Sequence, residues 1–216
     1  MSHTHIKFCG LTRAEDVRLA VELGVDYLGL VFAAGSPRQL SLSQACELRA
    51  LVPEEIAVVA LVMDDSAASI ESIIQQVKPD LLQFHGHEQD SDCAGFGVPF
   101  FKAIAMGGDR QEHGPTAAAY PSAYGLLLDG HAQGEQGGSG QRFDWTRVPA
   151  GLGKPFLVAG GLCPDNVASA IHTARPWGVD VSSGIESSPG VKDADRMRHF
   201  VEETRRADSR RNRGQD

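Results

Sequence analysis

The chain has 216 residues, of which 42% are hydrophobic, and a formal net charge of −8 at pH 7. This length fits one α/β domain of the larger kind and supplies enough apolar residues for a sizeable core. No apolar run approaches the about eighteen residues of a membrane span, and the first residues lack the features of a secretion signal. We therefore expect a cytoplasmic protein without a membrane partner.

The cysteines and the chain ends argue against further classes of protein: disulfide-rich, metal-binding and nucleic-acid-binding ones. The four cysteines lie far apart and form no CxxC pair, which indicates reduced thiols rather than a disulfide framework or a zinc site. His3 and His5 form at most a weak metal pair, so we predict no metal. Five arginines between Arg205 and Arg213 predict a solvated helix end, with a disordered basic tail over 208–216. No aromatic residue is interleaved there to stack on bases, so no nucleic-acid partner is expected.

Short runs rich in leucine or β-branched residues recur along the chain. Most are continuously apolar, as strands buried on both faces are. They predict eight strands, over residues 6–10, 27–32, 56–63, 81–86, 99–106, 125–130, 155–162 and 178–184.

Helical patterns separate these runs. Residues 14–23 after Thr12 and residues 42–51 after Ser41 begin with a capping box, in which Glu or Gln follows the capping residue by three. Apolar residues at helical spacing predict three more helices, over 66–77, 166–174 and 197–204.

Two segments have weaker patterns. Residues 88–97 and 107–119 have little periodicity, so we predict a loop or a stub of helix there, and a weak or missing helix after the fifth strand. Asp64 and Asp65 are interpreted as caps of the helix from residue 66 rather than as metal ligands.

Strands that alternate with helices predict right-handed βαβ units and a parallel sheet. Eight such units favour a closed (β/α)8 TIM barrel, a single domain over residues 1–207, at the compact end of that fold's usual size. An open doubly wound sheet is the alternative, but the first strand lacks the GxGxxG turn that would favour dinucleotide binding.

In such a barrel the chemistry lies at the carboxyl ends of the strands. These ends carry a thiol, a guanidinium, an imidazole and a carboxylate, from Cys9, Arg38, His85 and Asp129. Each has a plainer interpretation: Cys9 as a small buried hydrophobe, Arg38 as a solvated cation, His85 as a structural group and Asp129 as a turn residue.

Glycine-rich turns follow the last two strands. They are Gly160-Gly161 and the "SSG" of residues 182–184, which contains Ser183 and Gly184. Successive backbone N–H groups in such turns, followed by a helix N-terminus, form a nest for phosphate, and these are the loops in which barrels commonly hold it.

Cys9 and Asp129 lie three strands apart around an eight-membered ring, so they face one another across its mouth. An acid and a base placed on opposite sides of a bound sugar could move protons without a metal. For that, Asp129 must stay protonated, which an apolar neighbourhood favours. Cys9 must be a thiolate, so its pKa must fall below the reference value of about 8.5, helped by a nearby cation or helix N-terminus.

Seven stretches, in this order, are similar to the phosphoribosylanthranilate isomerase family of tryptophan biosynthesis. They are "KFCGLTRAEDV" (7–17), "GLVFAAGSPR" (29–38), "LLQFHGHE" (81–88), "LLLDG" (126–130), "GGSGQRFDW" (137–145), "VAGGLCPDNV" (158–167) and "GVDVSSGIESSPGVKD" (178–193).

The resemblance implies an Amadori rearrangement of N-(5′-phosphoribosyl)anthranilate to 1-(2-carboxyphenylamino)-1-deoxyribulose 5-phosphate. Asp129 matches the family's general acid, which would protonate the furanose ring oxygen. Cys9 matches its general base, which would take the proton from C2′. The nitrogen already present in the substrate makes an external cofactor unnecessary.

The resemblance also implies how this phosphorylated small molecule is bound. Arg38 would hold the anthranilate carboxylate, Asp180 matches an acidic family position near the substrate, and His85 matches the histidine of a motif on the fourth strand. Backbone groups around four residues would bind the phosphate: Gly160, Gly161, Ser183 and Gly184. The glycine-rich segment 131–142 is similar to an active-site lid.

Alternatives remain at this point. An aminoaldose isomerase of histidine biosynthesis performs the same chemistry on a substrate with two phosphates, but that family resembles a carboxylate pair with a twofold repeat, whereas Cys9 ends the first strand here. A non-catalytic phosphate-binding barrel is disfavoured only by the joint presence of Cys9 and Asp129. A monomer and a homodimer are equally compatible with the sequence.

Overall fold

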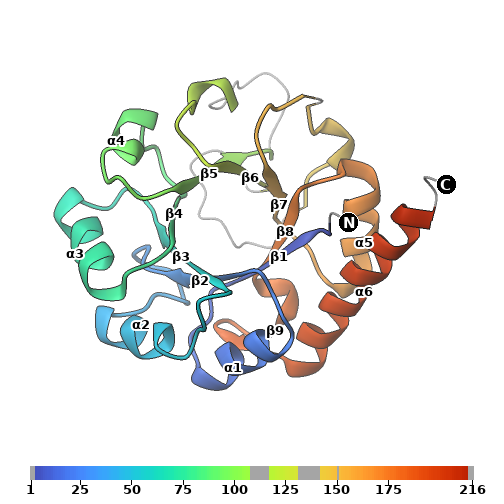
Figure 1. Ribbon diagram of the computed structural model, residues 1–216, viewed down its shortest axis with the longest axis horizontal. Helices are drawn as coiled ribbons and strands as arrows, with labels where there is room; N and C mark the ends of the chain where they lie inside the picture. The colour runs from blue at the N-terminus through green and yellow to red at the C-terminus, as the bar shows by residue number, and fades with distance from the viewer. Residues whose placement is uncertain (1–2, 108–116, 131–141, 150, 214–216) are drawn as a thin grey trace.

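The computed structural model describes residues 3–107, 117–130, 142–149 and 151–213, without the side chains of 117 and 211–213. Eight parallel strands close into a barrel in chain order, and helices surround it (Figure 1). The strands are β1 His5–Cys9, β2 Tyr27–Val31, β3 Ala57–Val62, β4 Leu81–Phe84, β5 Phe100–Ala105, β6 Gly125–Asp129, β7 Phe156–Val158 and β8 Gly178–Val181. The predicted single (β/α)8 barrel is confirmed.

The α-helices and smaller elements lie outside this ring. The α-helices are α1 Ala14–Glu22, α2 Leu42–Arg49, α3 Ala67–Val77, α4 Asp90–Ala94, α5 Pro164–Ala174 and α6 Ala194–Arg213. The 3-10 turns are η1 Ala117–Ala119, η2 Trp145–Arg147 and η3 Ser183–Ile185, and a two-stranded hairpin is formed by β9 Glu186–Ser188 and β10 Val191–Lys192. The described residues between β5 and β6 therefore hold a 3-10 turn; residues 108–116 lie outside the description, as do 131–141 of the predicted lid.

Tertiary contacts changed one of the two predicted helix starts. Ser41 caps α2 as predicted, and its capping box with Gln44 is complete. The capping box at Thr12 was wrong, because Arg13 is the N-cap of α1 and makes no side-chain capping bond. The Thr12 hydroxyl instead donates to the carbonyl of Gly190, at 2.5 Å, in the turn between β9 and β10.

The start of α3 also differs from the prediction. Its N-cap is Ser66, whose side chain accepts the N–H of Ser69, rather than either preceding aspartate. Asp65 accepts the N–H of Met63, and Asp64 accepts the N–H of His87 in the loop after β4. The two aspartates therefore shape loops at the rim of the barrel.

Alternation along β1 positions the residues that matter most. Ile6 and Phe8 pack into the large apolar layer between the barrel and the helices. His5, Lys7 and Cys9 occupy the opposite face of the strand and point into the barrel, because successive side chains of a strand alternate. The strand thus places an imidazole, an ammonium and a thiol in order from the amino end of the barrel to its carboxyl end.

Aromatic side chains close the amino end of the barrel. Tyr27 and Phe101 lie with ring centroids 5.8 Å apart, and Tyr124 and Trp177 extend the group.

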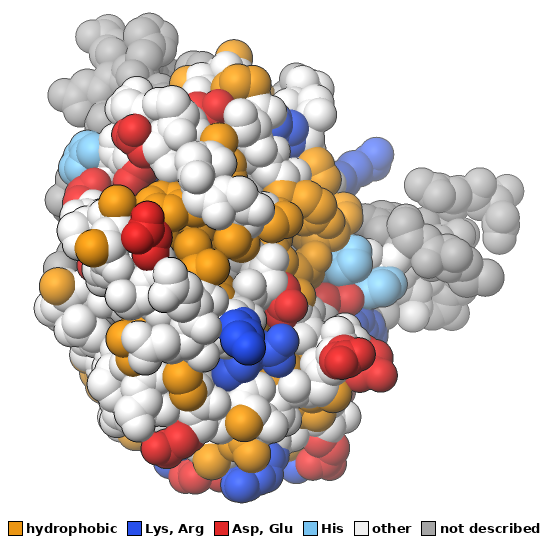
Figure 2. Space-filling view, turned by 60° about the vertical axis from the view of Figure 1, so that its left-hand side comes forward, with side chains coloured by type: hydrophobic (Ala, Val, Ile, Leu, Met, Phe, Trp, Pro, Cys, Tyr) orange, Lys and Arg blue, Asp and Glu red, His pale blue; other side chains and the backbone are white. Residues whose placement is uncertain are grey.

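On the face in Figure 2, hydrophobic side chains form a band across the middle, with charged side chains around it. Of the large hydrophobic residues described, only Tyr124 is strongly exposed, at 45%. The apolar surface there is mostly the edge of buried packing.

Helix α6 is longer than expected and is fastened to the start of the chain. The carboxylate of Asp208 accepts the N–H of Thr4 at 2.8 Å and its hydroxyl at 2.6 Å. Both residues are buried. Helix α6 continues to Arg213, six residues past the domain boundary predicted at residue 207. Within the described ranges, none of the helices combines the length and apolar character needed to cross a bilayer.

Candidate active site

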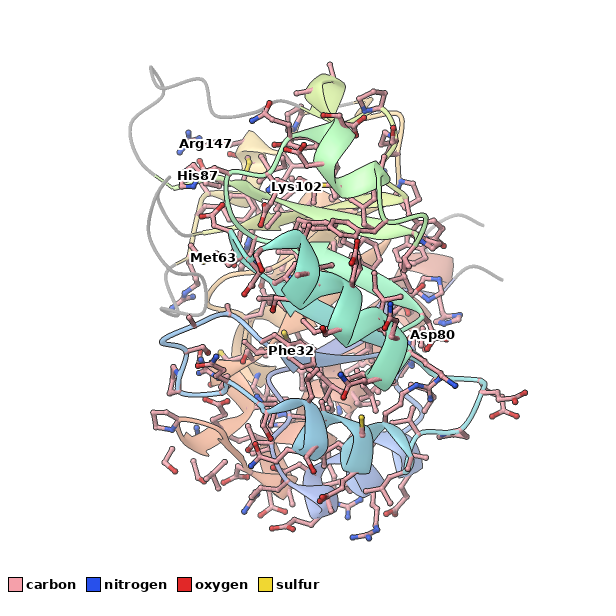
Figure 3. The ribbon with its side chains drawn as sticks, turned by 90° about the vertical axis from the view of Figure 1, so that its left-hand side faces the viewer. Phe32, Met63, Asp80, His87, Lys102 and Arg147 are labelled. Carbon is pink, nitrogen blue, oxygen red and sulfur yellow. The ribbon has the colours of Figure 1, made fainter. Side chains whose placement is uncertain are left out.

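A pocket of about 90 Å³ opens at the carboxyl end of the barrel. Figure 3 views the barrel from the side: Met63 and His87, which follow β3 and β4, lie towards one end, and Asp80, which precedes β4, lies towards the other. Eight of the predicted site residues line the pocket: Cys9, Arg38, His85, Asp129, Gly160, Gly161, Asp180 and Ser183. The strand ends thus bring together side chains that are scattered along the sequence.

Two glycines make room around Cys9. A Cβ on Gly29 of the neighbouring strand would lie 2.7 Å from the Cys9 sulfur. Gly10 has a φ of +72°, and a Cβ there would collide with the Arg38 side chain. The two glycines therefore allow the thiol and the guanidinium to pack at the pocket wall.

The surroundings of Cys9 oppose its ionisation on balance. Burial raises the pKa of the Cys9 thiol above its ordinary value, because a buried thiolate would lose its hydration, and the Asp180 carboxylate adds to this. The ammonium groups of Lys7 and Lys192 lower the pKa but do not offset the burial. The lowered pKa that a thiolate base at Cys9 requires is therefore not found in this arrangement, although nearby cations are present.

The nearer cation, Lys7, is fully buried inside the barrel below Cys9. Its Nζ donates to Oδ1 of Asp180 at 2.7 Å, across the paired strands β1 and β8. Asp180 lines the pocket, and Lys7 supports it from inside the barrel.

Asp129 ends β6 and faces His85 at the end of β4. Its Oδ2 lies 3.5 Å from Nε2 of His85, and both side chains are less than a tenth exposed. The Gln83 amide nitrogen lies 3.1 Å from the other ring nitrogen of His85. If that amide donates, the proton of a neutral imidazole is on Nε2, facing Asp129. The arrangement places a buried imidazole directly beside the Asp129 carboxylate.

Arg38 is held by a buried carboxylate that the sequence did not suggest. Its Nε and Nη2 donate to the two oxygens of Glu186, each at 2.7 Å. Lys192 Nζ donates to Glu186 at 2.7 Å and to the carbonyl of Cys9 at 2.7 Å. Burial alone would raise the pKa of Glu186, but the two cations hold it below its usual range.

Charges of both signs lie at and behind the pocket wall. Three cations, Lys7, Arg38 and Lys192, stand against three carboxylates, Asp129, Asp180 and Glu186. Arg38 lines the pocket itself, so its guanidinium is placed to meet a carboxylate or a phosphate of a ligand.

In the two glycine-rich turns, some residues line the pocket and others pack one turn against the other. Gly160 and Gly161 line the pocket with φ values of +79° and +61°, which side chains with a Cβ rarely adopt. Ser183 lines it from the neighbouring loop. Gly184 is absent from the lining: a Cβ there would collide with the carbonyl of Leu162, so it packs one turn against the other.

The sequence analysis missed three charged residues and Gly29. Lys7 was seen only as a strand residue, and Glu186 and Lys192 lie in a hairpin more than 140 residues from Arg38. The alternation of β1 was the one signal that could have placed Lys7 beside Cys9. No potential metal site lines the pocket: in the described part of the chain, only His3, His5 and Asp26 bring three ligand atoms within 4.8 Å of one another, and they lie at the amino end.

Comparison with known proteins identifies the family. Residues 6–203 match the family model of N-(5′-phosphoribosyl)anthranilate isomerase. The chain belongs to this family. It is therefore an isomerase of tryptophan biosynthesis.

Relatives and solved structures agree with this assignment to the isomerase family. The chain is 54% identical to N-(5′-phosphoribosyl)anthranilate isomerase of Xylella fastidiosa over 211 residues, which cover 96% of this chain and 94% of that one. The isomerase structure from Thermus thermophilus superposes with a TM-score of 0.82 at 30% identity, covering 94% and 99% of the two chains. A second isomerase structure, with reduced 1-(o-carboxyphenylamino)-1-deoxyribulose 5-phosphate bound, has a TM-score of 0.80 at 30% identity, covering 94% and 98%.

Proposed function

We propose that the chain converts N-(5′-phosphoribosyl)anthranilate to 1-(2-carboxyphenylamino)-1-deoxyribulose 5-phosphate, with Asp129 as general acid and Cys9 as general base. The observation that carries the proposal is their joint presence in one pocket, which Arg38 also lines. The structure of the relative that binds a reduced form of the product supports the same substrate class.

The first step opens the ring. Asp129 donates a proton to the furanose oxygen, the C1′–O4′ bond breaks, and the nitrogen lone pair forms a protonated Schiff base with C1′. The imidazole of His85, 3.5 Å from the Asp129 carboxylate, stabilises the negative charge that the proton leaves behind.

The second step moves the hydrogen. Cys9 takes the proton from C2′, and the electrons of that C–H bond form the C1′=C2′ double bond of an enolamine while the nitrogen becomes neutral. The enolamine loses the proton of its 2′ hydroxyl and gains one at C1′, so the sum is an isomerisation.

Ionisation of Cys9 is favoured by the substrate itself. The thiol is held mainly protonated by burial, with Lys7 and Lys192 working in the opposite direction. The protonated Schiff base brings a further positive charge beside the sulfur, and a neighbouring positive charge favours the thiolate. The thiol proton passes to solvent, and the resulting thiolate is the base that acts on the intermediate.

Binding uses the two anionic ends of the substrate. The glycine turn at Gly160-Gly161 and the backbone at Ser183 support a phosphate site, with Gly184 as the contact that fixes the two turns together. Arg38 takes the anthranilate carboxylate while Glu186 holds its guanidinium in place. Asp180 acts through Lys7, to which it is bonded.

The same proposal includes a compartment and an assembly. The free cysteines among the described residues, two of them buried, suit the reducing cytoplasm. Each barrel holds a whole pocket in one chain, so we expect activity in a monomer or in a homodimer.

The test is consumption of the substrate. N-(5′-phosphoribosyl)anthranilate is labile, so it is generated in the cuvette, and its fluorescence is followed with and without the purified protein and with and without EDTA. We expect a decay much faster than the spontaneous one and unchanged by EDTA. Folded protein that does not accelerate the decay would contradict the proposal, and conversion of only the histidine-pathway aminoaldose would assign the pocket to that substrate.

A further inference from the structure

We propose that His3, His5 and Asp26 form a binding site for a divalent transition-metal ion at the amino end of the barrel. The three ligand atoms, Nε2 of His3, Nδ1 of His5 and a carboxylate oxygen of Asp26, lie within 4.8 Å of one another. The sequence alone indicates only the histidine pair, because Asp26 comes from the segment that enters β2.

The distances between ligand atoms match those around a metal ion. Oδ1 of Asp26 lies 3.0 Å from Nε2 of His3 and 2.9 Å from Nδ1 of His5. An octahedral ion with bonds of about 2.1 Å separates neighbouring ligand atoms by about 3.0 Å, and a tetrahedral one by about 3.4 Å. Small side-chain movements therefore suffice to admit an ion between the three atoms.

The two oxygens of Asp26 have separate tasks. Oδ2 accepts the N–H of Ile6 at 2.8 Å and faces Arg205 of α6 at 3.7 Å. Oδ1 faces the two imidazoles. The backbone and α6 thus hold the carboxylate in place, with its other oxygen directed at the histidines. Residues that contact metal ligands commonly orient them in this way.

The imidazoles are also held in place. The ring of His5 packs against Trp177 with centroids 4.0 Å apart, and the ring of His3 lies 4.8 Å from that of His5. His3 is half exposed, so water has access to complete the coordination of an ion. The site is therefore ordered on the barrel side and open on the solvent side.

The charges of the donor set suit a cation. Asp26 contributes a carboxylate, whose negative charge offsets part of the charge of a divalent ion. A neutral imidazole can carry its proton on either ring nitrogen, so both histidines can turn a lone pair towards an ion. Two imidazole nitrogens and one carboxylate oxygen are typical ligands of Zn²⁺ and of neighbouring first-row metals.

This site lies at the opposite end of β1 from Cys9. An ion there would tie the start of β1 to the segment that enters β2, and it would have no contact with the pocket. We therefore expect Zn²⁺ to raise the thermal midpoint of unfolding and to leave turnover unchanged.

The experiment is a calorimetric titration of tag-free, chelator-treated and reduced protein with Zn²⁺. We compare the wild-type protein with His3→Ala, His5→Ala and the matched control His172→Ala, which removes an exposed histidine of α5. The expected result is one ion per chain, with the affinity lowered by about tenfold or more in His3→Ala and His5→Ala and unchanged in His172→Ala. Co²⁺ serves as a second probe, through the visible absorption that imidazole ligands give it.

Two results would overturn the site. One is the absence of saturable Zn²⁺ binding by the wild-type protein, and the other is an affinity that His3→Ala leaves unchanged. Since His3 is half exposed, its replacement is not expected to impair folding, and circular dichroism of each variant checks this.

Discussion

The two ends of the same barrel are built in opposite ways. At the carboxyl end, short glycine turns and buried ion pairs surround an open pocket. At the amino end, the rings of Tyr27, Phe101 and Trp177 close the interior, and the polar groups stay at the edge. Strand β1 contributes to both, with His5 at one end and Cys9 at the other. The position of a polar residue along a strand therefore decides whether it faces a ligand or supports the fold.

Replacement of the proposed acid should abolish most of the activity at the carboxyl end of the barrel without affecting the packing at the amino end. Asp129→Asn keeps the shape of the side chain but cannot donate an acidic proton to the ring oxygen. We expect kcat/KM to fall by about 10²- to 10⁴-fold, with the thermal midpoint little changed. Asp144→Asn, at the N-cap of the 3-10 turn η2, is the control, and equal activities of the two variants would remove Asp129 from the mechanism.

Replacement of Glu186 should show that the buried charges of the pocket also support the fold. In Glu186→Gln, Arg38 and Lys192 lose the carboxylate that both contact at 2.7 Å. We expect the free energy of unfolding, measured in urea, to fall by about 3 kcal/mol, because two cations stay buried without their partner.

The control for this variant is an exposed ion pair. Glu22 lies 3.8 Å from Arg198 with 70% of its side chain exposed, so Glu22→Gln should change the free energy of unfolding by less than about 0.5 kcal/mol. A similar loss of unfolding free energy in both variants would show that the buried Glu186 stabilises the fold no more than an exposed carboxylate does.

At the amino end, the contribution of Asp26 to the free energy of unfolding should depend on pH. Its pKa is lowered to about 2 in the folded protein, below its ordinary value of 3.8. The stabilisation is therefore complete above about pH 4 and is lost as the pH falls through about 2. Asp26→Asn should lose about 1 to 2 kcal/mol at neutral pH and flatten the acid limb of stability, as part of the effect is screened by solvent. An unchanged acid limb would contradict this.

The smallest expected effect is a displacement of the pH profile of kcat/KM. The active base is the thiolate of Cys9, so activity is lost as the pH falls through the pKa of Cys9, which lies above its ordinary value. Lys7→Met removes a cation that lowers this pKa and should move the limb to higher pH. Asp180→Asn removes a carboxylate that raises it and should move the limb to lower pH. Shifts of the same sign in both variants would contradict the electrostatic account.

Periodic and local features were predictable from the sequence, and long-range partners were not. The eight apolar runs predicted all eight strands of the barrel. A strand buried on both faces is continuously apolar, so it can be recognised from its own sequence without knowledge of its neighbours. The ring order then brought Cys9, Arg38, His85 and Asp129 to one pocket. Thr12 shows the limit: its local capping signal was outweighed by a contact with Gly190, 178 residues away.

The electrostatics of the pocket show the same limit more sharply. A cation near Cys9 was expected, but the sign of the pKa shift depends on how completely the thiol is buried, which no local pattern reveals. Glu186 and Lys192 come from a hairpin whose strands are three and two residues long, too short for periodicity to indicate a role. Likewise, the His3 and His5 pair acquired a third partner only when the barrel brought Asp26 beside it.

The most direct test of the account is the turnover of Cys9→Ser beside that of Cys46→Ser. Cys46 lies on α2, outside the pocket, so its replacement controls for the loss of a thiol as such. Both variants are assayed by the decay of substrate fluorescence after circular dichroism has shown that they are folded. The account predicts near wild-type turnover for Cys46→Ser and a severe loss for Cys9→Ser, because a serine hydroxyl is a far weaker base at the C2′ proton. Near-normal turnover in folded Cys9→Ser would contradict it.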